Sequence, residues 1–371
     1  MKVLQFGKFF PPDIGGMETF MFDLTEELSR KIKCDVLCSN SKNKTLVEKR
    51  DNYIVTRAAS LGRILSTSLS PAMIYQLKMI GNNYDVIHMH LPDPMAALAF
   101  FLVRPKSKLV LHWQSDIVRQ KFLLKIYEPL QYWLLKRADR IIATSPKYAT
   151  DSIYLDKYKN KCVIISLGIN PNKLTADNEK VAATKNKYRD KPIILFVGRL
   201  IYYKGIEYLV EAMRDVDGYL LIIGGGPLKD KIRDLIEKLA LTKKVFLLGR
   251  IEDDDLGSYY KACDLLCLPS IHKSEAYGLV QLEAMNFGKP VVSTIIKGSG
   301  VDWVNQSDIT GLTVEPKNPK ALAGALNKII QDPGRGKILG QNGKTRFERE
   351  FNIKITAARI NNLYREILRN Q

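Results

Sequence analysis

The sequence has few cysteines and no long apolar run, and both shortages narrow what the protein can be. Its five cysteines lie in or beside apolar strand-like segments, so neither a disulfide scaffold nor a zinc site is expected. The longest uncharged apolar stretch, Pro94 to Val103, is about half of the roughly 20 residues that a membrane-spanning helix needs. The opening MKVLQFGKFF predicts a strand, not a secretory signal. We therefore expect a cytoplasmic protein with reduced thiols.

Acidic residues are also scarce, with 39 against 57 lysines and arginines, which gives a net charge of +18. Such a surplus attracts polyanions, namely nucleic acid, anionic lipid or phosphorylated metabolites. Nucleic-acid binding favours clustered basic residues with interleaved aromatic residues, whereas the basic residues here are dispersed. The composition favours a membrane-surface enzyme and no nucleic acid as partner, although it leaves both classes open.

Short β-branched runs alternate with amphipathic stretches along the chain, which predicts doubly wound parallel sheets. One series of six runs extends from MKVLQF to KCVIISLG and a second from IILFVGRL to GLTVEP. We expect an α/β protein of two Rossmann-like doubly wound parallel-sheet domains facing a central cleft, which is the default active site. The expected parts are domains at 1–170 and 191–352, a polar linker at 171–190, and a C-terminal helix at 353–371 that returns to the first domain.

Two glutamates in the second half mark a candidate ligand site. Glu275 and Glu283 flank Gly278, and a helical pattern starts near Leu279. The first amides of such a helix point away from it and can hold oxyanions or sugar hydroxyls. Earlier in the chain, Arg199 follows a buried strand and a glycine, and Lys204 comes five residues later.

An arginine and a lysine at the end of a strand suit a diphosphate, because one supplies a planar fork and the other a point charge. Near the N-terminus, Gly15 and Gly16 lie between a strand and a helix, where backbone can approach a ligand closely. This pattern is not the GxGxxG fingerprint, so a nicotinamide dehydrogenase is poorly supported.

Histidines and aspartates give weaker signals. His112 ends the strand LVLHW at the edge that faces the expected cleft, and it is a candidate for substrate contact. His88 and His90 share one face of a strand, and packing is their expected role. The run Asp253 to Asp255 lies where a helix begins, so helix capping explains it and no metal site is expected.

Taken together, these residues show that the chain resembles the family 4 retaining glycosyltransferases of the two-Rossmann-domain (GT-B) type. The motifs PPDIGGME, RADRIIATSP, SLGIN, FVGRL and SEAYGLVQLEAMNFGKPVVS stand in the family's order over essentially the whole length. The segment HWQSDIVRQ resembles the subset that builds bacterial O-antigens and exopolysaccharides on lipid-linked acceptors. Asn170 departs from the aspartate that is usual in the family at that hinge-like position.

The resemblance implies a role for each site residue. Arg199, Lys204 and Gly16 would bind the donor diphosphate, Glu283 the ribose, and Arg250 with Ile251 the base. His112 would contact the sugar near the reacting carbon, so His112 and Glu275 are the catalytic candidates. The donor sugar would be held by one loop and helix start, comprising Glu275, Tyr277, Gly278, Leu279 and Val280.

The implied reaction moves a hexose from a nucleoside-diphosphate sugar, with GDP-mannose slightly favoured, to a lipid-linked saccharide in cell-surface polysaccharide synthesis. No cofactor and no metal is expected, because two cations already face the leaving diphosphate. Basic-apolar segments at 104–108 and 119–125 predict peripheral attachment to the inner face of the anionic cytoplasmic membrane. A UDP-sugar transferase with another acceptor, a sugar-nucleotide epimerase or a phosphorylase would share the fold, and a basic nucleic-acid-binding protein is the alternative of a different class.

Overall fold

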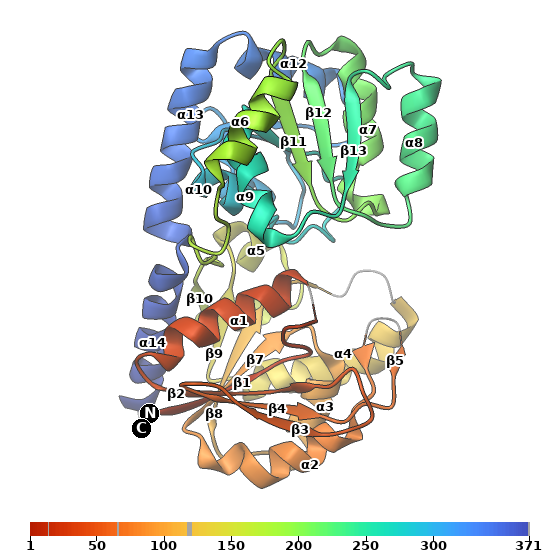
Figure 1. Cartoon of the computed structure of the whole chain (residues 1–371). Coiled ribbons are helices and arrows are strands. Elements are labelled where there is room, and N and C mark those ends of the chain that lie inside the picture. The colour runs from red at the N-terminus through yellow and green to blue at the C-terminus, as the bar shows by residue number, and fades with distance from the viewer. Residues whose placement is uncertain (14, 65–66, 117–120, 370–371) are drawn as a thin grey trace. The chain divides into compact units, whose positions relative to one another are not determined.

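The computed structural model describes residues 1–13, 15–64, 67–116 and 121–369. The chain forms two compact units (Figure 1). Unit 1 comprises Met1–Gly168 together with Ile353–Gln371, and unit 2 comprises Ile169–Asn352. The last helix therefore belongs to the same unit as the first strand.

Unit 1 is built on a sheet with the strand order β10-β9-β8-β7-β1-β2-β4-β3. Neighbouring strands are parallel, except that β3 is antiparallel to β4. A separate hairpin pairs β5 (Arg63–Ile64) with β6 (Thr67–Ser68). The strands of the sheet are β1 (Lys2–Phe6), β2 (Lys33–Ser39), β3 (Leu46–Lys49), β4 (Ile54–Ala58), β7 (Val86–Leu91), β8 (Lys108–Trp113), β9 (Arg140–Ala143) and β10 (Cys162–Ile164).

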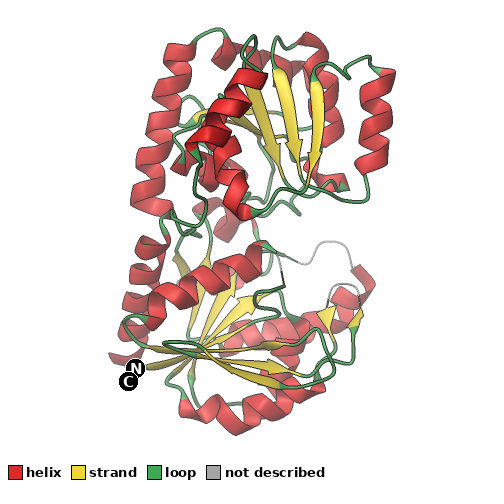
Figure 2. Cartoon of the chain, viewed as in Figure 1, coloured by secondary structure: helices red, strands yellow, loops and turns green. Residues whose placement is uncertain are grey.

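Helices cover both faces of this sheet (Figure 2). Side chains such as Leu4 and Ile87 point to one face, where they form one apolar cluster with α2 (Pro71–Ile80), α3 (Pro94–Val103) and α4 (Lys121–Arg137). Alternate side chains point to the other face, towards α1 (Gly16–Ser29) and α14 (Ile353–Arg369). This period-2 alternation assigns each strand residue to one helical layer. Smaller elements are α5 (Pro146–Asp151) and the 3-10 turns η1 (Gly81–Asn83) and η2 (Asp156–Lys161).

Unit 2 contains a fully parallel sheet with the order β13-β12-β11-β14-β15-β16. Its strands are β11 (Ile193–Val197), β12 (Tyr219–Ile223), β13 (Val245–Gly249), β14 (Leu265–Leu268), β15 (Val291–Thr294) and β16 (Gly311–Val314). The helices are α6 (Asn178–Lys187), α7 (Ile206–Ala212), α8 (Lys229–Lys238), α9 (Asp253–Ala262), α10 (Val280–Asn286), α11 (Val301–Val304), α12 (Pro319–Ile330) and α13 (Pro333–Arg346), with turns η3 (Tyr202–Lys204), η4 (Met213–Asp215) and η5 (Phe347–Phe351).

The structure confirms the predicted fold class and all twelve predicted strand runs, but the polar segment 171–190 differs from the expected linker. That segment lies within unit 2 and contains α6, which Asp177 caps through its side chain. Leu174 and Val181 are buried there. Val181 is the buried residue within α6 itself, and Lys180 pairs with Asp255 of α9, so a largely polar helix attaches to unit 2 through few apolar side chains. In the described part of the chain, no helix is long and apolar enough to cross a membrane.

Candidate functional site

The strand order of unit 2 reverses between β11 and β14. From β11 the chain moves outward through β12 to β13, and it then returns to β14 on the other side of β11. Ligands of open α/β sheets bind at such a reversal, beyond the carboxyl ends of the strands. The loop that follows β11 carries Arg199 and Lys204, and the loop that follows β14 carries Glu275.

Lys204 and Glu275 meet at this edge. The Lys204 Nζ lies 2.6 Å from Glu275 Oε2, and both side chains are about nine-tenths buried. Ser270 Oγ donates to the same carboxylate oxygen at 2.8 Å, and Ser270 is fully buried. A charged pair taken out of water is stable only when further hydrogen bonds support it. Ser270, which the sequence analysis did not single out, supplies one of them.

Glycines allow the neighbouring loops to close around this pair. Gly224 and Gly226 follow β12 with φ of 134° and 156°, values that side chains rarely permit. A Cβ on Gly224 would overlap the carbonyl oxygen of Gly198, and one on Gly226 would lie 2.5 Å from the Leu200 carbonyl oxygen. The Leu200 amide donates to the Gly225 carbonyl at 2.9 Å. The glycine run therefore fixes the loop that carries Arg199 and Lys204.

Arg199 differs from Lys204 in its surroundings. Its side chain is exposed, whereas Lys204 is buried beside Gly198, where a Cβ would lie 3.4 Å from the lysine Nζ. The two cations predicted to act together are thus an exposed guanidinium and a buried ammonium on one loop. The predicted phosphate contacts themselves remain a prediction.

A second polar chain borders the pair. Tyr202 Oη lies 3.0 Å from Ser274 Oγ, and Ser274 Oγ lies 3.0 Å from His272 Nδ1. These side chains come from the same two loops as Lys204 and Glu275, and sequence reasoning missed all three. Their only signal was their position beside the glutamate segment.

Glu283 lies in the first turn of α10, close to the position expected from the sequence. Tyr260 Oη of α9 donates to Glu283 Oε2 at 2.5 Å. Burial raises the pKa of the Glu283 carboxyl to about 7, and the Tyr260 hydroxyl and Lys173 act in the opposite direction. A carboxyl group whose pKa lies near 7 can exchange protons at neutral pH and can accept hydrogen bonds from ligand hydroxyls.

The start of α10 matches the predicted loop-to-helix transition. Tyr277 and Gly278 are buried, and Gly278 has φ of 74° because the chain must turn there. Leu279 occupies the N-cap position of α10 without a side-chain capping hydrogen bond, and Val280 is the first residue of the helix. The first amides of a helix have no acceptor within it. Their predicted contacts with a sugar are not tested by this geometry.

The two residues predicted to contact the base follow β13. Gly249 has φ of 75°, and after it Arg250 is exposed while Ile251 is half-buried. Arg250 Nε lies 3.3 Å from Glu252 Oε1. The neighbouring carboxylates of the Asp253 to Asp255 run occupy the first turn of α9, as expected for helix-dipole complementarity. Two of them, Asp253 and Asp255, pair with Lys173 and Lys180.

Unit 1 places His112 differently from the prediction. The side chain is completely buried on the α1 face of the sheet, and its ring lies 5.0 Å from Phe20. It stacks on His88 and His90, with ring centroids 5.3 and 5.5 Å away. The prediction placed His112 at an open strand end, but in the structure α1 covers the ring. His88 and His90 are packed in the core, as expected.

The edge of unit 1 at β1 carries the glycine pair. Gly16 is exposed and begins α1, and Gly15 precedes it. A Cβ on Gly15 would overlap the Glu18 carboxylate. Asp93, after β7, caps α3 through Oδ1 and has a buried Oδ2 without a partner among the described residues. The predicted role of Gly16 in binding the diphosphate remains a prediction.

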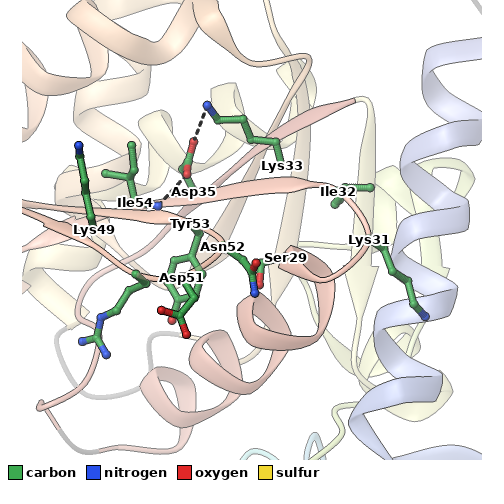
Figure 3. Close-up of a pocket in the computed structure, with 11 residues that line it drawn as sticks. Ser29, Lys31, Ile32, Lys33, Asp35, Lys49, Asp51, Asn52, Tyr53 and Ile54 are labelled. Atoms are coloured by element: carbon green, nitrogen blue, oxygen red, sulfur yellow. Dashed lines mark hydrogen bonds and ion pairs between the residues drawn. The ribbon is translucent and has the colours of Figure 1, made fainter.

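A groove of about 520 Å³ lies elsewhere in unit 1 (Figure 3). It is lined by basic residues such as Lys31 and Lys49, and Lys33 Nζ lies 4.0 Å from Asp35 Oδ2. Asp35 also accepts from the Ile54 amide at 2.8 Å. The groove lies where β2 and β4 begin, which is the opposite end of the strands from the ligand-binding edge. We assign it no part in the site.

Comparison with known proteins identifies the family of the chain. Residues 14–173 match the model of Glycosyltransferase Family 4, and residues 177–346 match that of Glycosyl transferases group 1. The O-antigen chain mannosyltransferase C of Escherichia coli is 32% identical over all of both chains. The chain belongs to glycosyltransferase family 4.

Two further comparisons concern a relative by sequence and a solved structure of similar fold. A D-rhamnosyltransferase of Pseudomonas aeruginosa is 33% identical over 95% of this chain and 92% of that protein. The Anabaena protein HepE, solved in complex with UDP, has a TM-score of 0.79 and 20% identity over 99% of this chain and all of that one. The second likeness supports the GT-B fold, whose two parallel-sheet units are described above.

Proposed function

We propose that this glycosyltransferase moves a hexose from a nucleoside-diphosphate sugar to a lipid-linked saccharide, with retention of configuration, in O-antigen-type polysaccharide synthesis. The observation that carries the proposal is the buried Lys204–Glu275 pair at the reversal of the unit 2 sheet, with exposed Arg199 on the same loop. Unit 2 would hold the donor, and unit 1 would hold the acceptor.

The positive charges of these residues suit a reaction in which a nucleoside diphosphate leaves the sugar. Breaking the sugar–phosphate bond places negative charge on the departing nucleotide and oxocarbenium character on the sugar. Lys204 and Arg199 stabilise the departing charge more than they stabilise the intact donor, which lowers the barrier. Metal independence is part of the proposal, because these two cations would supply the charge at the diphosphate.

Retention is proposed to occur by front-face substitution. Glu275 is already engaged by Lys204 and Ser270, and the family resemblance directs it to sugar hydroxyls. The leaving phosphate would take the proton of the acceptor hydroxyl as the new bond forms. A glycosyl-enzyme adduct on Glu275, seen by mass spectrometry of the quenched reaction, would contradict this mechanism.

Further donor contacts complete the proposal. Glu283 would accept from the ribose hydroxyls, and Arg250 and Ile251 would lie against the base. The backbone from Tyr277 to Val280 would hold the sugar, and Gly16 would approach the diphosphate. His112 is left out of the proposed substrate contacts because its ring is buried.

Mannose is the favoured sugar, since the mannosyltransferase relative matches this chain over its full length. The rhamnosyltransferase relative and the UDP complex of HepE keep a rhamnosyl donor and a UDP-hexose as alternatives. We also propose that the protein works on the inner face of the cytoplasmic membrane, where a lipid-linked acceptor would be available.

The test is a thermal-shift panel of GDP, UDP, GDP-mannose and UDP-glucose, followed by transfer assays with the donor that stabilises the protein. A ligand that binds only the folded protein raises its melting temperature according to its affinity. We expect the largest shift with GDP-mannose, and an α-linked product by NMR of the anomeric proton. Stabilisation by UDP-glucose alone would establish the UDP-sugar alternative.

A further inference from the structure

A short turn after β14 presents Glu275 to Lys204. Within it the Ser274 amide donates to His272 Nδ1 at 3.2 Å, and the Glu275 amide donates to the His272 carbonyl oxygen at 2.9 Å. His272 therefore accepts from two successive amides, one through its ring and one through its backbone. An asparagine side chain stabilises turns in the same way, by accepting from the amide two residues further along the chain. We call residues 272–275 the histidine turn.

The hydrogen bonds of the turn determine where its protons lie. A backbone amide can only donate, so His272 Nδ1 accepts from Ser274 and carries no proton. The Ser274 hydroxyl, which lies 3.0 Å from the same nitrogen, must then donate to it. Tyr202 Oη lies 3.0 Å from Ser274 Oγ and donates to the serine in turn. The hydrogen bonds thus run in one direction, from Tyr202 through Ser274, and end on the acceptor nitrogen of His272.

The histidine turn is attached to the loop that carries Lys204. The ring of Tyr202 lies 6.0 Å from the ring of His272, in addition to the hydrogen-bonded chain between them. The Ile271 amide, directly before the turn, donates to the Tyr203 carbonyl oxygen at 2.8 Å. Side-chain and backbone contacts therefore hold the turn against the residues that immediately precede Lys204.

From these contacts we infer that His272 is a positioning residue for Glu275. The unprotonated His272 Nδ1 holds the turn in the conformation in which the Glu275 carboxylate lies 2.6 Å from Lys204 Nζ. The inference rests on the proposed function, in which Glu275 holds the donor sugar while Lys204 faces the departing diphosphate. A change of about 1 Å in the place of such a group can lower a reaction rate about 100-fold. His272 thus acts on transfer through the turn and is not itself a catalytic residue.

Asparagine and glutamine distinguish the two ring nitrogens of His272. The amide oxygen of asparagine takes the place of Nδ1, because both atoms are bonded to Cγ, whereas the longer glutamine reaches the place of Nε2. His272→Asn therefore keeps the acceptor of the turn, and His272→Gln removes it. With the donor that the thermal-shift panel selects, we expect kcat of the asparagine variant to stay within about threefold of the wild type. The glutamine variant should lose about 10-fold to 100-fold in kcat.

Further measurements separate positioning from folding. Melting temperatures without ligand check that each variant folds. The shift with the nucleoside diphosphate of the selected donor should be the same in the wild type and both variants, because this ligand has no sugar for Glu275 to hold. Exchange of the Ser274 amide, followed by NMR, needs no substrate. We expect it to be about tenfold faster in His272→Gln than in the wild type or His272→Asn.

Lys273→Gln is the matched control within the same turn. This exposed lysine lies between the two partners of the hydrogen bond, so its substitution changes the turn without removing the donor or the acceptor. It should leave both kcat and the exchange of the Ser274 amide unchanged.

Three kinetic results would overturn the inference. They are wild-type kcat in His272→Gln, loss of kcat in His272→Asn, or a loss in Lys273→Gln equal to that in His272→Gln. Unchanged exchange of the Ser274 amide in His272→Gln would overturn it as well. If the wild type transfers no sugar from any donor of the panel, the proposed function fails, whereas the amide exchange still decides whether His272 Nδ1 holds the turn.

Discussion

Units 1 and 2 are both built on mainly parallel sheets, but they place their polar side chains at different positions. In unit 2 the strand-end loops bring Lys204 and Glu275 together at the sheet edge. In unit 1 a comparable row of polar side chains, His88, His90 and His112, is buried on the middle of a sheet face and held neutral. In unit 2 the polar side chains lie in loops beyond the strand ends, where a ligand can reach them. In unit 1 the histidines lie within the strands, and α1 covers them. The predictions below test that contrast.

The largest expected effect is the acid sensitivity of unit 1. Burial lowers the pKa of all three histidines, that of His90 to about 3. When a folded pKa lies below the unfolded value, the unfolded chain binds more protons, so stability is full above about pH 6.5 and falls below it. For each histidine that stays neutral in the folded protein, the free energy of unfolding falls by at most about 1.4 kcal/mol per pH unit below that point.

Two buried carboxyl groups oppose the effect of the histidines. Burial raises the pKa of Asp93 to about 6 in unit 1 and that of Glu283 to about 7 in unit 2, so both favour the folded state on acidification. Amide hydrogen exchange at about pH 7.5 and about pH 5.5 should therefore show β7 and β8 losing protection before β11 and β14. His112→Phe should reduce the pH dependence of unit 1. Earlier loss of protection in β11 and β14 would contradict the prediction.

The next effect concerns Lys204. We expect Lys204→Met to reduce kcat/KM by about 10²–10³-fold, because removing one preorganised charge at a developing anion has that effect. The variant also leaves Glu275 buried without its cation, so melting temperature must be measured alongside activity. Lys337→Met, at an exposed lysine on α13, is the matched control and should leave both quantities unchanged.

A smaller effect is expected for Ser270. Ser270→Ala removes the hydroxyl that donates to Glu275 and should lower kcat/KM about 10-fold to 100-fold, the usual value for a hydrogen bond to a charged group. The buried Ser258, which contacts Asp177 in the same unit, provides the control Ser258→Ala. If both alanine variants lose activity equally, the serine hydroxyl has no specific part in positioning the carboxylate.

The smallest expected effect is that of a chelator. Within the described residues no cluster of histidine, cysteine and carboxylate side chains could hold a metal ion. We expect transfer rates in EDTA to equal those in magnesium, because on the proposed function Arg199 and Lys204 would provide the positive charge at the diphosphate. Loss of activity in EDTA that magnesium restores would contradict metal independence. It would indicate that the donor diphosphate carries a required cation into the site.

The sequence predicted the scaffold well because buried parallel strands are continuous β-branched runs bounded by turns. It also predicted that Lys204 and Glu275 belong to one site, because both follow strands that end at the same edge of the sheet. It missed β3 and β4. In β3 the residues LVEK place one apolar and one charged side chain on each face, so no apolar stripe marks this short edge strand. The segment 171–190 was taken for a linker because α6, which lies in it, attaches to unit 2 through few apolar residues.

His112 shows a different limit. Its register partner is His90, so both point to one face of the sheet, and the packing expected of His90 applied equally to His112. The alternation was visible in the sequence, but the pairing of the strands was not. Ser270 was missed for a related reason, since a loop serine has no periodicity, and only the folded loop shows which carboxylate it meets.

The Lys204–Glu275 contact has a consequence for selectivity. With its charge already balanced, this ammonium gives little net attraction to small free anions such as inorganic phosphate, which are abundant in cells. A ligand that displaces the carboxylate must leave it with new partners, and the hydroxyls of a sugar can provide them. On the proposed function, free phosphate would meet a Lys204 ammonium that Glu275 already balances, whereas the donor would bring a phosphate together with hydroxyls that can replace the ammonium at Glu275.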